Sequence, residues 1–167
     1  MTKVLYRLGW LVGLVLLQAL VLNHVHIAGY ATPFVYIYFL LKMPSDTTRV
    51  ELMLWAFGLG LAVDVFSDTP GMNAAAAVLM AFCRDRLLNL YLQRETVESI
   101  VPGTHSMGLA PFLRYMGTCV LVHHAALLAL EYLSLAHVAA LVLHVVSSAV
   151  LTSICIIGLE SLNHKPS

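Results

Sequence analysis

The sequence has little charge. Only 11% of its 167 residues are Asp, Glu, Lys or Arg, and 60% are hydrophobic, with a mean hydropathy of +0.86. Average soluble chains carry about 25% charged and about 45–50% apolar residues, so a soluble domain of this size could not bury so much apolar surface. The formal net charge is zero, which argues against nucleic acid as a partner. The composition predicts an integral membrane protein.

Cysteines are also few, and they lack paired spacing. Cys83, Cys119 and Cys155 each lie inside an apolar run, their number is odd, and none belongs to a CxxC motif. This pattern excludes a disulfide framework and a cysteine metal site, so we interpret all three as small buried hydrophobic residues.

Motifs of catalysis are missing from the chain. It contains no GxSxG, HExxH or P-loop pattern, and no pair of carboxylates is spaced for hydrolysis. The sequence therefore predicts a protein that is not an enzyme and that needs no cofactor or metal. His123, His124 and His144 lie within apolar segments, where they could form a proton relay with Glu131 or bond inside a helix bundle. The second interpretation is favoured because a relay needs a continuous chain of acids and bases.

What the sequence does contain is a series of apolar segments, most of them close to the 20 or so residues that cross a hydrocarbon core. They predict an all-α integral membrane protein in which residues 1–167 form one transmembrane domain, a bundle of about six helices, the first retained as a span. Gly29 and Pro33 interrupt the second segment, which should be a short or kinked helix whose freed backbone groups are covered by neighbours. The expected spans are 4–22, 27–43, 50–66, 73–92, 111–133 and 135–159.

Basic residues have a one-sided distribution in this six-span topology. All nine Lys and Arg fall on the same side of the membrane as the N-terminus. Cytoplasmic loops carry an excess of Lys and Arg, so both termini are predicted to lie in the cytoplasm.

Small residues mark the faces on which helices could pack closely. Gly58 and Gly60 leave one flank of the third segment with almost no side-chain bulk, and the fourth segment begins with Ala74 and Ala75. Membrane helices associate through such close backbone approach, so these residues predict a tight helical hairpin. A further candidate packing step in the first segment consists of Gly9 and Gly13.

The connection between the third and fourth segments has strong turn chemistry. Pro70 and Gly71 predict a type II turn, in which proline presets φ and glycine supplies a positive φ. Asn73 is expected to cap the following helix. Asp64 and Asp68 flank the turn with no Lys or Arg nearby, so the hairpin is predicted to present two acids at one membrane face. Asp64 could be a structural acid that caps the hairpin or a contact for a partner.

At this hairpin the chain resembles the MreD family of bacterial rod-shape proteins. The resemblance rests on the run from Gly60 to Asp64, the short turn, Gly71 and the small-residue helix from Ala74. Overall length, the expected span count and the lack of extramembrane domains extend it over nearly the whole chain.

The resemblance implies a non-enzymatic scaffold in the bacterial inner membrane. Its expected partners are an MreC-like protein, an MreB-like filament, a RodA-type glycosyltransferase and a class B penicillin-binding transpeptidase. It also implies a fold similar to the substrate-binding subunits of energy-coupling-factor transporters. The alternative function is therefore a small-molecule (vitamin) binding subunit of a membrane importer, which would need a polar pocket that faces outward.

Overall fold

The structure is a computed structural model that describes residues 2–24, 32–92, 99–131 and 138–162. Helices make up the secondary structure of this described part, which contains no strand. The elements are α1 (Thr2–Leu20), η1 (Leu22–His24), η2 (Val35–Ile37), α2 (Tyr38–Leu41), α3 (Arg49–Ser67), α4 (Met72–Tyr91), α5 (Thr104–Met107), α6 (Leu109–Glu131) and α7 (Val138–Leu162).

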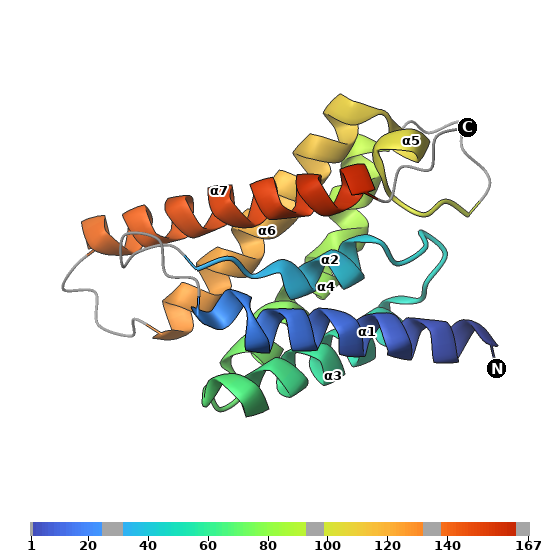
Figure 1. The fold of residues 1–167 in the computed structure, drawn as a ribbon. Coiled ribbons are helices and arrows are strands. Elements are labelled where there is room, and N and C mark those ends of the chain that lie inside the picture. Colours follow the sequence, from blue (N-terminus) through green and yellow to red (C-terminus); the bar gives the residue numbers. More distant parts are fainter. Residues whose placement is uncertain (1, 25–31, 93–98, 132–137, 163–167) are drawn as a thin grey trace.

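The long helices pack as a bundle around a short central segment (Figure 1). Helix α3 packs on α4, α4 on α6, and α6 on α7, while α1 lies against α3. The elements η2 and α2 lie between α1 and α7. Helices far apart in sequence therefore enclose a piece of chain that is itself too short to cross a membrane.

Three of the described helical stretches are long and apolar enough to cross a membrane: Arg49–Ser67, Leu109–Leu130 and Val142–Leu162. A shorter apolar stretch covers Val4–Leu20. Large apolar side chains are exposed along α3 at the 3–4-residue spacing of one helix face that can contact lipid: Leu54, Phe57, Leu61 and Val65. The protein is therefore a helical membrane protein, and the count of six spans stays a prediction.

The fourth expected span is one continuous helix, as predicted, but its two halves differ. Its first half is apolar and rich in alanine, whereas Arg84, Asp85 and Arg86 interrupt its second half. The apolar part is thus too short to be a full span, and the helix continues beyond it to Tyr91.

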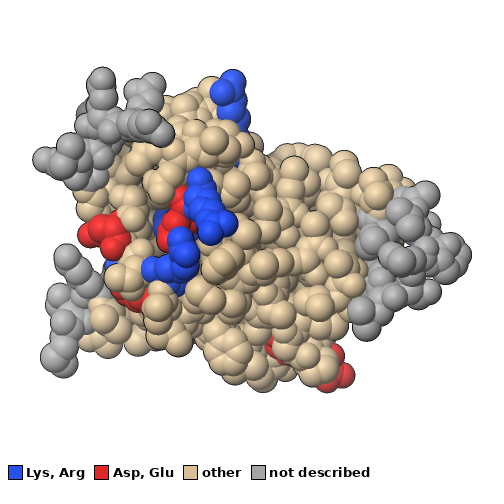
Figure 2. Space-filling view, turned by 180° about the vertical axis from the view of Figure 1, so that it is seen from behind, with Lys and Arg blue, Asp and Glu red and all other residues tan. Residues whose placement is uncertain are grey.

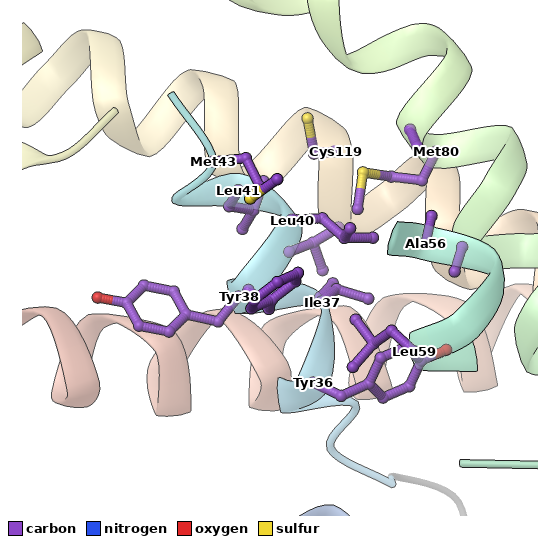
Figure 3. Close-up of a cluster of buried hydrophobic side chains, with 14 of the residues drawn as sticks. Tyr36, Ile37, Tyr38, Leu40, Leu41, Met43, Ala56, Leu59, Met80 and Cys119 are labelled. Atoms are coloured by element: carbon purple, nitrogen blue, oxygen red, sulfur yellow. The ribbon is translucent and has the colours of Figure 1, made fainter. Parts of the chain in front are cut away.

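The second expected span departs most from a simple helix. In its described part, which we call the central segment (residues 32–43), three extended residues lead into η2 and the single-turn helix α2. Its core is completely enclosed, because Tyr36, Ile37, Phe39, Leu40 and Leu41 are all 0% exposed (Figure 3). The described residues thus have the short, interrupted helix that was expected, while the start of the expected span 27–43 lies outside the described residues.

Figure 1 shows α1 beginning and α7 ending at the same end of the bundle, and Arg7 and Glu160 lie close to these two helix ends. Ion pairs join Arg7 to Glu51 at 2.6 Å, linking α1 with α3, and Lys42 to Glu160 at 3.1 Å, linking the central segment with α7. Figure 2, seen from behind, shows the Lys and Arg side chains in the left half of the view. The described basic residues thus lie on one side of the bundle, as the sequence predicts.

Candidate functional site

The turn between α3 and α4 has the predicted geometry. Gly71 has φ 81° and ψ 1°, the values of the third residue of a type II turn. Asp68 ends α3 in the left-handed conformation, with φ 53°, and its amide donates to the carbonyl of Asp64. Glycine and aspartate are among the residues that adopt this conformation most readily, which explains both positions.

Asp64 holds the hairpin together from the inside. Its side chain lies on α3, is 4% exposed, and accepts hydrogen bonds from the backbone amides of Asn73 and Ala74, both at 3.0 Å. It also accepts from the Thr69 hydroxyl at 2.8 Å and from the Asn73 side-chain amide at 3.0 Å. These backbone amides belong to the first turn of α4, where they have no partner within the helix. The carboxylate of one helix therefore caps the next.

Two expectations about this turn are corrected by that geometry. Asn73 is not the cap, because α4 starts at Met72 after Gly71, and Asn73 already lies inside the helix. Asp64 is not a hydrated acid presented at a membrane face, because its oxygens are buried and bonded within the hairpin. Asp68 and Pro70 are exposed. A partner contact at the turn remains a prediction, and Asp68 is the acid available to make it.

Gly60 marks the closest approach of α3 and α4. A Cβ atom built on Gly60 would lie 2.5 Å from the Cα of Ala74, a distance that backbone packing cannot accommodate. The predicted close packing is confirmed for Gly60 and for Ala74, which is buried. A Cβ atom built on Gly58 would meet no atom within 4 Å, and Ala75 is exposed. Neither residue therefore lies in this contact.

Gly9 and Gly13 on α1 are likewise not used for packing inside the described structure. Both are exposed, and a Cβ atom on either would meet nothing within 4 Å. The GxxxG step therefore seats no other described helix of this chain.

A buried polar network connects the hairpin to the middle of the bundle. The Tyr36 hydroxyl donates to the Asn73 side-chain oxygen at 3.1 Å and lies 2.7 Å from Nε2 of His123. His124, next in sequence, pairs through Nδ1 with the Val120 carbonyl at 2.8 Å. The two histidines are thus bonded inside the bundle, which is the interpretation that the sequence favoured over a proton relay. The side chain of Glu131, the fourth member of that relay, lies outside the described residues.

Side chains from α1 and α7 satisfy the backbone of the central segment. Gln18 bridges it twice, donating to the Pro33 carbonyl at 2.9 Å and accepting from the Val35 amide at 2.9 Å. The Phe34 amide donates to the Thr152 hydroxyl, also at 2.9 Å. Non-helical backbone at membrane depth needs such partners, because no water is available there. The predicted covering of freed backbone groups by neighbours is confirmed.

Arg84 anchors the other end of the central segment. It is the largest fully buried side chain described, with 0% exposure. Its Nε donates to the Tyr115 hydroxyl at 3.0 Å, and its Nη2 donates to the Met43 carbonyl. Tyr115 in turn donates to the Leu41 carbonyl at 3.3 Å. The carbonyl of Leu41, the last residue of α2, and the carbonyl of Met43 just beyond the helix are thereby paired.

Glu160 on α7 gathers a second set of bonds near that end. Its carboxylate accepts from the Tyr38 hydroxyl at 2.6 Å, from Nζ of Lys42 at 3.1 Å and from the Thr104 amide at 3.1 Å. Gly103 permits this cluster, because a Cβ there would lie 2.6 Å from the Lys42 Nζ. One acid thus joins the central segment and α5 to α7.

Sequence reasoning missed Tyr36, Arg84 and Glu160 as organising residues. Glu160 gave a usable signal, since it follows directly on the uncharged expected span 135–159, and charged residues at the ends of such segments are functional or structural candidates. Arg84 lies in the charged run 84–86, and nothing local in the sequence distinguishes it from Arg86. The cysteines are free, as predicted: Cys119 is buried, and the other two are partly buried.

The chain was compared with protein-family models, curated proteins and solved structures, and none of the three comparisons found a match. Among the described residues, no group of three or more His, Cys, Asp or Glu side chains is placed to hold a metal ion. What the described polar groups do, by their geometry, is hold helices and the central segment in fixed positions.

Proposed function

We propose that this protein is a non-enzymatic scaffold of the bacterial cell-wall elongation complex, of the MreD type. In this proposal it lies in the inner membrane with both termini in the cytoplasm. It links an MreC-like protein and an MreB-like filament to a RodA-type glycosyltransferase and a class B penicillin-binding transpeptidase. The run Gly60–Asp64, Gly71 and the helix from Ala74 support it, because they carry the family resemblance.

The observation that carries the proposal is the internal use of the buried polar side chains. Asp64 caps α4, Arg84 pairs with carbonyls of the central segment, and Glu160 binds three elements together. Buried polar groups that are bonded to one another are not free to bind a substrate or ligand, and such networks make the bundle rigid, as a scaffold surface requires. The bonding of these groups therefore suits a scaffold.

The same bonding weakens the case for a vitamin-binding importer subunit. Such a subunit needs polar groups that face the outside and are free for a ligand. At the turn, the Asn73 side chain already donates to Asp64 and accepts from Tyr36. The remaining described acid of the turn is Asp68.

Copurification tests the proposal. We expect the tagged protein, extracted in mild detergent, to bring down an MreC-like protein that mass spectrometry identifies. Asp68→Asn should retain normal abundance, because the side chain is exposed and asparagine tolerates a positive φ, but it should recover less of the partner. If a small molecule is retained and no such protein is recovered, the importer subunit is favoured. If Asp68→Asn recovers the partner fully, the hypothesis of a partner contact at the turn is wrong.

Asp64→Asn serves as the matched control for folding. Both Asp64 oxygens accept bonds, so an amide would turn an NH₂ group towards an amide N–H of α4. An unsatisfied buried pair of this kind costs about 1–3 kcal/mol. We expect Asp64→Asn to lower the melting temperature and the abundance, whereas Asp68→Asn leaves both unchanged.

A further inference from the structure

An apolar groove runs along the outside of the α3–α4 hairpin. Its volume is about 530 Å³, and residues of both helices line it, with small side chains between large ones. Ala75 and Gly71 belong to its lining, as do the rings of Phe57 and Phe82. The groove therefore has the shape and surface to receive something apolar and narrow.

Two arginines lie over the ring at one end of this groove. The guanidinium carbons of Arg49 and Arg86 are 5.4 and 5.8 Å from the centroid of the Phe82 ring. The Arg49 side chain is 45% exposed, and Arg86 is also exposed. One end of the groove is thus cationic, while the rest of its lining is apolar.

The positive charge at this end is only partly balanced. Asp85 is the acid paired there, 3.8 Å from Nε of Arg49, and it also lies 3.5 Å from Nη1 of the buried Arg84. Two guanidinium groups therefore share one carboxylate, and Arg86 adds a third positive charge beside them. Figure 2 shows such basic side chains around acidic atoms, next to a broad surface without charge.

The length of the groove also carries information. From Phe82 back to Gly71 the helix advances about 16 Å at 1.5 Å per residue. This distance is close to about 15 Å, half the thickness of a hydrocarbon core. A lipid whose headgroup lies at the arginines could therefore place one acyl chain along the lined length, towards the turn at Gly71.

We propose that this groove binds an anionic phospholipid. One acyl chain lies along α3 and α4, and the phosphate lies between Arg49 and Arg86, where guanidinium groups form paired, charge-assisted hydrogen bonds with phosphate oxygens. The arginines lie at the end of the bundle that collects the basic residues, where anionic lipid headgroups attract cations. The groove is independent of the proposed scaffold function, since it needs only the hairpin and the membrane.

Native mass spectrometry of the intact, delipidated protein in detergent tests this site. We expect dioleoyl phosphatidylglycerol to bind with at least tenfold higher affinity than dioleoyl phosphatidylcholine, which has the same acyl chains. Arg49→Gln combined with Arg86→Gln should remove this preference and leave the weak binding of phosphatidylcholine unchanged. Arg114→Gln is the matched control, because Arg114 is an exposed basic residue on α6, away from the groove.

A second variant tests the apolar part of the site. Ala75 is exposed and lines the groove, so Ala75→Leu fills it without entering the contact between α3 and α4. It should lower the affinity for both lipids while the melting temperature stays unchanged. Equal binding of the two lipids by the parent, or an equal loss in Arg114→Gln, would overturn the proposal. So would unchanged lipid binding in Ala75→Leu together with loss of a copurifying protein, which would assign the groove to a partner helix.

Discussion

Gly60 and Asp64 act on the same pair of helices, one through the absence of a side chain and the other through two bonded oxygens. Gly60 lets the backbone of α4 approach at Ala74, and Asp64 then reaches the free amides of Asn73 and Ala74. The close approach and the cap depend on each other, because a wider separation would take those amides out of hydrogen-bond range.

The substitution of alanine for Gly60 and for Gly58 should affect the stability of the protein differently. Gly60→Ala forces the α3 and α4 backbones apart and should destabilise the protein by about 1–3 kcal/mol. Gly58→Ala enters open space and gains helix propensity, so it should leave stability unchanged or raise it by up to about 1 kcal/mol. Thermal unfolding of both variants in mild detergent checks this, and equal melting temperatures would contradict the packing assigned to Gly60.

The sequence predicted a small-residue face but not which of its members form the contact. Residues two apart on a helix differ by about 200° in direction at 3.6 residues per turn, so Gly58 and Gly60 cannot face the same neighbour. The same holds for the choice between Ala74 and Ala75, which depends on the rotation of α4. The cap was misassigned to Asn73 for a related reason, since the acid that caps α4 lies on another helix.

At the scale of elements, the central segment depends on the helices around it. A single-turn helix is not stable by itself, because the conformational entropy lost in forming the first turn exceeds the free energy gained from its hydrogen bonds. Its shape is set by Gln18 and Thr152 at one end and by Arg84 and Tyr115 at the other.

Removal of one of these partners should be costly. Gln18→Leu leaves the Val35 amide and the Pro33 carbonyl without partners in a buried place, which should destabilise the protein by about 2–6 kcal/mol at about 1–3 kcal/mol for each group. Ser153→Ala is the control, because that hydroxyl only bonds back to the Ala149 carbonyl within α7. Melting in detergent measures both, and a Gln18→Leu protein as stable as Ser153→Ala would refute this role of the glutamine.

Sequence patterns predicted the break in this element and not its partners. Gly29 and Pro33 indicate that a regular helix cannot continue, which is a local property of the chain. The groups that repair the break lie up to 118 residues away, and their approach follows from packing of the whole bundle. Local periodicity carries no information about such distances.

At the scale of the whole molecule, composition was a good guide to the type of protein. High hydropathy and low charge predicted a helical membrane protein, and the bundle and its apolar surface confirm that. The one-sided distribution of Lys and Arg in the sequence also predicted that the described basic residues lie at one end of the bundle. The span count was harder to predict, because one apolar segment is enclosed by the others and α4 is only partly apolar.

Reporter fusions test the predicted orientation. A fusion after Leu92 should report the cytoplasm, and a fusion at Thr69 should report the opposite side, because α4 separates the two positions and basic residues lie at its second end. Reports from the same side at both positions would rule out a membrane-crossing α3–α4 hairpin.

The scaffold function is tested most directly by depletion of the protein in the bacterium that makes it. Wall synthesis along the cell sides is measured with a fluorescent cell-wall precursor. The account predicts that depleted cells lose lateral labelling and become round, and that the parent gene restores both. Rod-shaped depleted cells with normal lateral labelling would contradict the proposed function.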